Sequence, residues 1–437
     1  MRIIQIVPGT GNFYCGTCLR DHALARGLRS IGHDATMAPL YLPLVLEGDD
    51  EAQPILFGGI NLYLEHRSKL IRALPHWMVR WLDQPWLLRW AASRSSMTRA
   101  SVLGEVTVSM LRGEEGRQTR SLNRLANWLA TTHGTDVVCL ATALLVGMAR
   151  RIKQSTGAPV VCTLQGEDAF LDSLPQPHRD EAWATMSQRA ADVDAFVAVS
   201  GYYADVMKRR LDLPTDRVHV VHNGIDLEGF EPATQPPPQP VLGYLARMCR
   251  DKGLQTLVET FVLLRQRGQV ENLKLRIAGA RTRADEPFVD SLRKRLASAG
   301  LLDDVAFLPN IDRRSKLEFL RSISVLSVPA TYGEAFGLYI LEALGCGVPV
   351  VQPRHGAFAE LLEITGGGIL CKPDDPPALA EAIESVFHDL EAARAEAARA
   401  RGVVFDRFNA NRMADEVARV CEQVVARKQS ASGSGDS

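Results

Sequence analysis

The chain has 437 residues, of which 46% are hydrophobic and 23% charged, and its formal net charge is −1. This size exceeds what one hydrophobic core usually supports, so we expect two domains. The near-neutral charge excludes the electrostatic field that gathers nucleic acid, and the composition is that of a globular protein rather than a fibrous or disordered one.

Short apolar runs alternate with longer amphipathic stretches through the first half of the chain, which predicts parallel strands joined by helices, the α/β class. The opening run, Met1 to Pro8, is too short for the apolar core of a signal peptide and predicts the first strand. Helices are expected at Leu19–Ile31 and Glu181–Asp192. The predicted strands are Ile3–Val7, Val137–Leu140, Val160–Leu164, Ala195–Val199 and Val218–Val221.

One segment of the first half departs from this rhythm. Residues 67–99 hold four of the six tryptophans, seven basic side chains and one acidic side chain. We predict a helical insertion spanning residues 62–115 of the first domain. It forms a lid or wall of an acceptor cleft, touches a membrane surface, or binds a protein partner, and the sequence leaves these alternatives open. In each case its positive charge favours an acidic or phosphate-bearing acceptor.

A proline-rich segment then interrupts the pattern. Residues 231–240 cannot form a sheet interior and predict a linker between a first domain at 1–230 and a second at 241–410. The alternation restarts after it, so the expected architecture is two Rossmann-like, doubly wound parallel sheets. A final helix over Asn411–Arg427 is expected to pack back toward the first domain, ahead of a disordered tail at 428–437. The predicted strands are Val241–Leu245, Lys274–Ala278, Val305–Leu308, Ser324–Val328 and Val348–Val351.

The eight cysteines follow no disulfide-scaffold spacing, so we expect reduced thiols and a cytoplasmic protein. The longest apolar stretch, Val137 to Ala149, is too short to cross a bilayer, and a peripheral contact at the inner face of the membrane is the alternative. Cys15 and Cys18 have Cys-x-x-Cys spacing. They are small residues at a helix start, a redox-sensitive gate or half of a metal site. We expect no metal, because the sequence offers no second pair nearby.

The strongest chemical signal lies in residues 332–350. Apolar residues repeat there at helical spacing, and a β-branched run follows, which predicts a helix and then a strand. Glu334 is expected in the loop before the helix, with Glu342 about two turns inside it. The amides around Phe336, Gly337 and Leu338 would point outward at the helix N-terminus, where they suit an anionic or hydroxylated ligand.

Two cations follow a predicted strand of the second domain. Arg247 and Lys252 stand on the strand-to-helix loop after Val241–Leu245, at the expected carboxyl edge of a parallel sheet. Ligands of doubly wound sheets bind at this edge, and two cations there suit a diphosphate.

These residues resemble the motifs of glycosyltransferase family 4, the retaining enzymes with the GT-B fold. Glu334 and Glu342 match its Glu-x7-Glu pattern, and Arg247 and Lys252 match its Arg/Lys pair. Residues 221–226 (VHNGID), 275–279 (LRIAG) and 356–360 (GAFAE) resemble further family motifs in the family's order, with Ala357 where a second glycine is usual. The resemblance covers nearly the whole chain except the tryptophan-rich insertion and the tail. It implies two domains that face each other across a cleft.

The resemblance also implies a reaction: transfer of a hexose from a nucleotide diphosphate sugar, UDP- or GDP-linked, to an acceptor hydroxyl, with retention of the anomeric configuration. Arg247 and Lys252 would grip the donor diphosphate, Glu334 would contact the hexose, and Glu342 would accept hydrogen bonds from the ribose. Enzymes of this type usually need no metal. In the front-face mechanism proposed for them, the leaving phosphate helps take the proton of the acceptor, and preorganised charge at the phosphate is the main catalytic contribution.

Further site residues follow from the same resemblance. Asn310 lies in the loop 307–311, where this fold recognises the base, and Gly11 lies in the glycine-rich loop after the first strand. On the acceptor side, Gln165 and Asp168 stand in a segment that often contains His-Gly-x-Asp, and Asn223 belongs to VHNGID. Gln165 replaces the histidine, so it can hydrogen-bond a sugar hydroxyl but cannot titrate.

Three alternatives stay open at this stage. A nucleotide-sugar epimerase of the same fold would resemble a different motif set. A phosphorylase would need a lysine-bound pyridoxal cofactor. A non-catalytic protein that binds nucleotide sugars for regulation would bind without turnover.

Overall fold

The computed structural model describes residues 1–9, 16–40, 100–132 and 134–433. The chain divides into two compact units, the first made of Met1–His222 with Ala410–Ser437 and the second of Asn223–Asn409. In the described residues each unit has one six-stranded sheet, and every strand pair is parallel. The predicted α/β class with two doubly wound parallel sheets is confirmed.

The first sheet has the strand order β2-β1-β3-β4-β5-β6. All five strands predicted for the first domain are present, and their ends lie within two residues of the predicted positions. Asp34–Pro39 was not predicted, because its sequence DATMAP has only one β-branched residue and ends in proline. It pairs with the first strand all the same. The strands are β1 (Arg2–Val7), β2 (Asp34–Pro39), β3 (Val137–Leu140), β4 (Val160–Leu164), β5 (Ala195–Ala198) and β6 (Val218–Val220).

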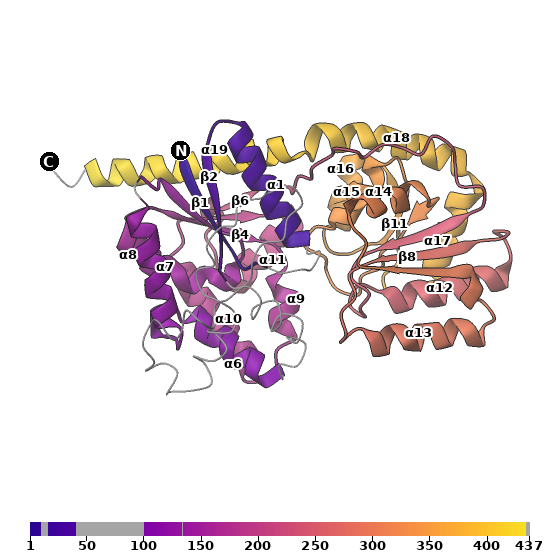
Figure 1. Cartoon of the computed structure of the whole chain (residues 1–437), viewed down its shortest axis with the longest axis horizontal. Helices are drawn as coiled ribbons and strands as arrows, with labels where there is room; N and C mark the ends of the chain where they lie inside the picture. The colour runs from indigo at the N-terminus through magenta and orange to yellow at the C-terminus, as the bar shows by residue number, and fades with distance from the viewer. Residues whose placement is uncertain (10–15, 41–99, 133, 434–437) are drawn as a thin grey trace. The chain divides into compact units, whose positions relative to one another are not determined.

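Helices cover both faces of this sheet. Figure 1 shows α1 and α19 above it and α6, α7, α8 and α10 below it. The helices are α1 (Gly16–Ser30), α6 (Ala100–Leu111), α7 (Thr119–Thr131), α8 (Ala149–Thr156), α9 (Glu167–Asp172), α10 (His178–Ala190), α11 (Gly201–Leu211) and α19 (Ala410–Gly433). Residues 62–99 of the predicted insertion lie outside the described residues. Its remainder, 100–115, contains α6, which packs on α10.

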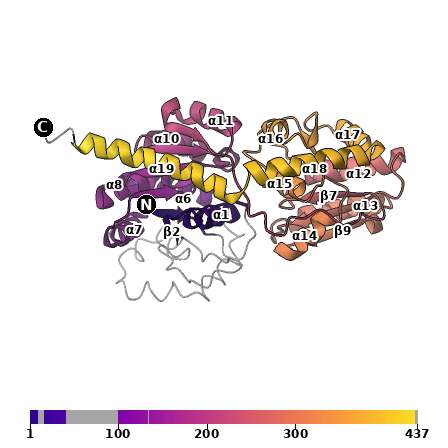
Figure 2. The same ribbon diagram turned by 90° about the horizontal axis from the view of Figure 1, so that it is seen from above.

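The last helix belongs to the core of the first unit. Leu28 of α1 and Met413, Val417 and Cys421 of α19 are buried in one cluster with strand residues such as Val161. Figure 2 shows α19 running beside α1 within this unit. The helix extends to Gly433, where a disordered tail was predicted from residue 428, because the lysine, glutamine and alanine there prolong an existing helix at little cost.

The second sheet has the order β12-β11-β10-β7-β8-β9. Gly368–Cys371 was not predicted, since it opens with glycine and has one β-branched residue. Residues 231–240, the predicted linker, contain no strand or helix and lie in the second unit. The strands are β7 (Val241–Leu245), β8 (Lys274–Gly279), β9 (Val305–Pro309), β10 (Val325–Leu326), β11 (Val350–Pro353) and β12 (Gly368–Cys371).

Helices also cover both faces of the second sheet, with α12 and α13 below it and α14, α15 and α16 above it in Figure 1. They are α12 (Leu254–Arg267), α13 (Glu286–Ser298), α14 (Arg313–Arg321), α15 (Leu338–Gly345), α16 (Phe358–Thr365), α17 (Pro376–His388) and α18 (Leu390–Arg407). Among the described helices of both units, none combines the length and the apolar character that a membrane span requires.

The contact between α1 and α19 predicts an effect of mutation. A Cβ atom on Gly27 would lie 2.7 Å from the carbonyl oxygen of Ala410 and 2.8 Å from the Cβ of Ala414. We therefore expect Gly27→Ala to lower the free energy of unfolding by about 1–3 kcal/mol. Gly402→Ala is the matched control, because nothing lies within 4 Å of its added Cβ. It should stabilise by about 0.5–1 kcal/mol. Urea unfolding followed by circular dichroism measures both, and an unchanged Gly27→Ala protein would contradict the packing of α19 on α1.

Candidate donor site in the second unit

The strand order of the second sheet reverses between β7 and β10. The chain passes from β7 outward through β8 and β9, and then returns to place β10, β11 and β12 on the other side of β7. In doubly wound sheets, ligands bind beyond the carboxyl ends of the strands at such a switch point. Arg247 and Lys252 follow β7, and Glu334 follows β10, so the fold brings all three to this point.

Lys252 and Glu334 are in direct contact. The Lys252 ammonium donates hydrogen bonds to Glu334 and to the hydroxyl oxygen of Tyr332. The hydroxyls of Tyr332 and Tyr339 donate to the Glu334 carboxylate, at 3.3 and 3.2 Å. The side chains of Lys252 and Glu334 are only 21% and 14% exposed. The ion pair is therefore largely shielded from solvent, and two phenols fix its carboxylate.

The charges of this cluster determine its protonation. Burial acts to lower the pKa of Lys252, but the Glu334 carboxylate and Tyr332 outweigh it and raise that pKa above its usual value. Burial and the Glu334 charge together raise the pKa values of Tyr332 and Tyr339. Lys252 therefore stays an ammonium at neutral pH, and both phenols stay neutral donors.

Two close backbone approaches bring these loops together. A Cβ atom on Gly253, which has φ +69°, would lie 1.6 Å from the carbonyl oxygen of Pro329. A Cβ atom on Gly356, at φ +59°, would lie 2.5 Å from the nitrogen of Glu334. The next residue, Ala357, donates its N–H to the Glu334 carbonyl at 2.9 Å and has φ −77°. This helical φ explains why alanine fits where the family usually has a second glycine.

Arg247 is held by a residue that the sequence analysis did not identify. Its guanidinium donates two hydrogen bonds to Asp285, at 3.0 and 3.3 Å. Thr282 donates two more to the same carboxylate, at 2.6 and 2.8 Å. Burial acts to raise the pKa of Asp285, but the bonds from Thr282 and Arg247 prevail and hold it below its usual value. Arg247 is 52% exposed, so it is oriented and still accessible.

Glu342 also has a lysine partner that was not predicted. Lys316 of α14 donates to its Oε1 at 2.5 Å, and both side chains are nearly buried. Glu342 lies little more than one turn inside α15, not two turns as predicted, because the helix begins at Leu338. Gly337, which has φ +98°, is the last residue of the loop before this helix. Phe336 is buried against Phe408.

Asn310 connects two loops at the same sheet edge. It has φ +55°, and its side-chain amide accepts from the N–H of Arg281 at 2.9 Å and donates to the Arg281 carbonyl at 3.1 Å. Its own N–H donates to the Gly279 carbonyl. The amide side chain is thus used within the protein, where it fixes the loop after β8 against the loop after β9.

Comparison with known proteins identifies the family of this chain. A model of glycosyl transferases group 1 matches residues 228–403, and a model of glycosyltransferase family 4 matches residues 89–228. The two models follow each other along the chain and together cover residues 89–403. The protein belongs to glycosyltransferase family 4.

Individual relatives of this chain have different names. A D-inositol 3-phosphate glycosyltransferase from Paenarthrobacter aurescens is 29% identical over 54% of this chain and 60% of its own length. The chain thus spans about 60% of the first curated relatives that it matches. A glycogen synthase from Mycobacterium tuberculosis is 27% identical over 80% of this chain and 88% of its own length.

Solved structures confirm the fold. HepE from Anabaena, in a complex with UDP-glucose, superposes with a TM-score of 0.67 at 16% identity, covering 97% of this chain and all of that one. The two parallel sheets of this chain are therefore those of the GT-B fold, as the motif resemblance implied.

The first unit has a buried carboxylate beside the residues predicted to contact the acceptor. Glu167 is 3% exposed and accepts five hydrogen bonds. Its donors are the hydroxyls of Thr142 and Tyr203 and the backbone N–H groups of Ala143, Gln165 and Gly166, at 2.8–3.1 Å. Glu167 therefore ties the loop after β3 to the loop after β4, and it was not predicted as a site residue.

The three acceptor-side candidates differ in their surroundings. The Gln165 amide donates to the carbonyl of Ala141. One carboxylate oxygen of Asp168 is buried and accepts no hydrogen bond from the described residues. Burial raises the pKa of this carboxyl, and the charge of Glu167 adds to the shift. Asn223 is buried and belongs to the second unit, whereas Gln165 and Asp168 belong to the first.

Of Gly11, Cys15 and Cys18, which the sequence analysis singled out, only Cys18 is among the described residues. Cys18 is buried in α1. Within the described part of the chain, no three His, Cys, Asp or Glu side chains gather as metal ligands would.

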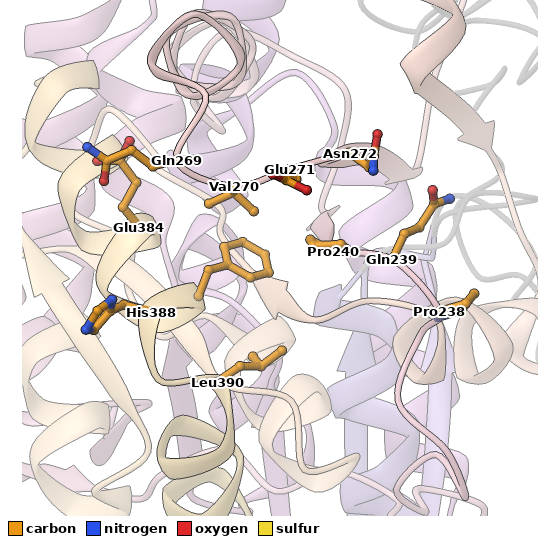
Figure 3. Close-up of a pocket in the computed structure, with 11 residues that line it drawn as sticks. Pro238, Gln239, Pro240, Gln269, Val270, Glu271, Asn272, Glu384, His388 and Leu390 are labelled. Carbon is orange, nitrogen blue, oxygen red and sulfur yellow. The ribbon is translucent and has the colours of Figure 1, made fainter.

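A pocket of about 470 Å³ lies elsewhere in the second unit. Figure 3 shows its walls, which include the linker residues 238–240, the loop 269–272 before β8, and Glu384 and His388 of α17. The first two segments precede β7 and β8, so this pocket is at the amino edge of the sheet. It contains none of the predicted site residues.

The contrast between Glu167 and Asp168 predicts opposite effects of removing their charges. Glu167→Gln loses acceptor capacity for five donors and should lower the free energy of unfolding by about 2 kcal/mol. Asp168→Asn removes a partly buried carboxylate and should leave stability unchanged or raise it by up to about 1 kcal/mol. Because the folded pKa of Asp168 is raised, its charge costs stability as the pH rises above its unfolded value of about 4.

Thermal unfolding at pH 4 and pH 7 tests both expectations. The unfolding temperature of Asp168→Asn minus that of the wild type should be larger at pH 7 than at pH 4. A loss of stability at pH 7 in Asp168→Asn as large as that in Glu167→Gln would contradict this account.

Proposed function

We propose that the protein is a retaining hexosyltransferase that uses a nucleotide diphosphate sugar, UDP- or GDP-linked, and an acceptor hydroxyl. The observation that carries the proposal is the largely shielded Lys252–Glu334 pair at the switch point of the second sheet, with Arg247 on the same loop as Lys252. A fixed cation beside a carboxylate provides what a sugar diphosphate needs: charge for the phosphate and an acceptor for hexose hydroxyls.

The two cations bind the donor diphosphate in this proposal. Lys252 keeps its proton because its pKa is raised, and Asp285 orients the guanidinium of Arg247. Both charges are preorganised, so little reorganisation is needed as negative charge builds up on the leaving phosphate. Removing one such donor typically costs about 3 kcal/mol, or on the order of 10²–10³ in rate. The same two cations support metal-independent transfer, because they supply the positive charge that a magnesium ion provides elsewhere.

The sugar portions of the donor contact the two glutamates. Glu334, held by Tyr332 and Tyr339, accepts hydrogen bonds from the hexose, and Glu342 accepts them from the ribose. The amides of residues 336–338 at the start of α15 face the phosphate side of the donor. The HepE complex with UDP-glucose supports a nucleotide sugar as the ligand class, since that protein has the same fold.

Retention follows from a front-face reaction. The acceptor hydroxyl attacks the anomeric carbon from the side of the leaving group, the bond to the phosphate oxygen breaks, and that oxygen takes the proton of the hydroxyl. No protein nucleophile is needed. The relatives are named for different compounds, D-inositol 3-phosphate and glycogen, so the proposal assigns the acceptor only as a hydroxyl compound. Gln165, Asp168 and Asn223 are its candidate contacts, and an acidic or lipid-linked acceptor is included.

Slow hydrolysis of the donor is the first expected activity. The purified protein is incubated with UDP-, GDP- and ADP-sugars, and released nucleoside diphosphate is measured. One donor should be hydrolysed, with Lys252→Ala slower by about 10²–10³-fold. The released hexose should keep the anomeric configuration of the donor, as read by proton NMR before mutarotation.

Lys294→Ala is the matched control, a lysine of α13 that is remote in sequence from the cluster, and it should hydrolyse the donor at the wild-type rate. Binding of a nucleotide sugar with no turnover on any acceptor would favour a regulatory binding protein. Absence of binding to every nucleotide sugar would refute the proposed function.

A further inference from the structure

We propose that Lys316 is the positioning residue that gives the donor site its preference for ribose, because it holds the Glu342 carboxylate in a fixed orientation. The inference rests on the proposed function, in which Glu342 meets the ribose hydroxyls. It concerns a residue that no sequence motif pointed to, on a different helix from Glu342.

Lys316 is placed by a well-defined helix. Asp312 caps α14 by accepting the N–H of Ser315 at 2.7 Å, and Lys316 follows one residue later. Its ammonium lies 2.5 Å from Oε1 of Glu342 in α15. The two side chains are 9% and 13% exposed. This contact joins α14 to α15 at the carboxylate that is proposed to bind the ribose.

The ammonium is also held from a second direction. It lies 5.9 Å from the ring centroid of Phe230, a buried residue. The turn that carries Phe230 is itself tied to α14, since Arg321 donates to the Gly229 carbonyl at 2.7 Å. The position of Lys316 therefore depends on packing as well as on its ion pair.

The pair assigns different tasks to the two oxygens of Glu342. Lys316 occupies Oε1, and within the described residues no donor bonds to Oε2. A ribose hydroxyl that reaches Oε2 meets a full carboxylate charge, which accepts a stronger hydrogen bond than a neutral acid does. Without Lys316, the nearly buried carboxylate would lose its compensating charge and the donor that orients it. It would then accept ribose hydroxyls less well.

The predicted effect is a change in specificity rather than a uniform loss of affinity. UDP, GDP and ADP are compared with their 2′-deoxy and 3′-deoxy forms by isothermal titration calorimetry on the full chain. For the base that binds, the wild type should prefer the ribonucleotide over at least one deoxy form by about tenfold or more. In Lys316→Met this ratio should fall toward one, while Lys316→Arg should keep most of it.

Two further variants separate this role from a structural one. Arg314→Met is the matched control, because this side chain is on the same helix and 88% exposed, and it should leave the ratio unchanged. Glu342→Gln should lose the ratio as Lys316→Met does, and the double variant should lose no more, as expected for two residues acting as a unit. If Lys316→Met does not fold, Lys316→Arg and Glu342→Gln still test the prediction.

The outcomes that overturn the inference are distinct from failure of the proposed function. A Lys316→Met protein that binds ribo- and deoxyribonucleotides equally less well, with the ratio intact, would show a structural role only. A wild type that binds both forms equally would remove the ribose role of Glu342 and this inference with it, leaving hexose transfer untouched. A wild type that binds no nucleoside diphosphate would refute both proposals.

Discussion

The donor site depends on backbone segments that approach each other more closely than any side chain allows. Gly253 lies against the Pro329 carbonyl and Gly356 against the backbone of Glu334, so three loops after β7, β10 and β11 pack main chain to main chain. Each glycine is next to, or in contact with, a charged residue of the site. Because Lys252 precedes Gly253 and Gly356 abuts Glu334, the same constraint that closes the loops brings the cation to its carboxylate.

Burial then determines how the charges are arranged. Each acidic group of the site has specific donors: Glu334 has Lys252 and two tyrosines, Glu342 has Lys316, and Asp285 has Arg247 and Thr282. In the first unit, Glu167 is satisfied by five neutral donors instead. Removing one partner of an ion pair that is shielded from water strongly destabilises the folded protein. The charged side chains are therefore fixed in place, which is the preorganisation that the proposed binding of a sugar diphosphate requires.

Much of this could be predicted from the sequence, and the exceptions have physical reasons. Strands that are short and mostly apolar, such as Val137–Leu140 and Val241–Leu245, were predicted to the residue, whereas Asp34–Pro39 and Gly368–Cys371 form because the neighbouring strand offers them a partner. Arg247, Lys252, Glu334 and Glu342 were found because their spacings are local. Asp285 and Lys316 were missed because their partners are distant in the chain. Asp285 follows a strand end at the same sheet edge, which is a signal that could have found it.

In the function proposed above, the carboxyl edge of the second sheet holds the donor diphosphate between Lys252 and Arg247. The most direct test is a crystal structure of the full chain with the nucleoside diphosphate that binds in solution. This account predicts phosphate oxygens within hydrogen-bond distance of the Lys252 ammonium and the Arg247 guanidinium, and the ribose against Glu342. A diphosphate bound at any other place, with Lys252 and Arg247 contacting only Glu334 and Asp285, would contradict it.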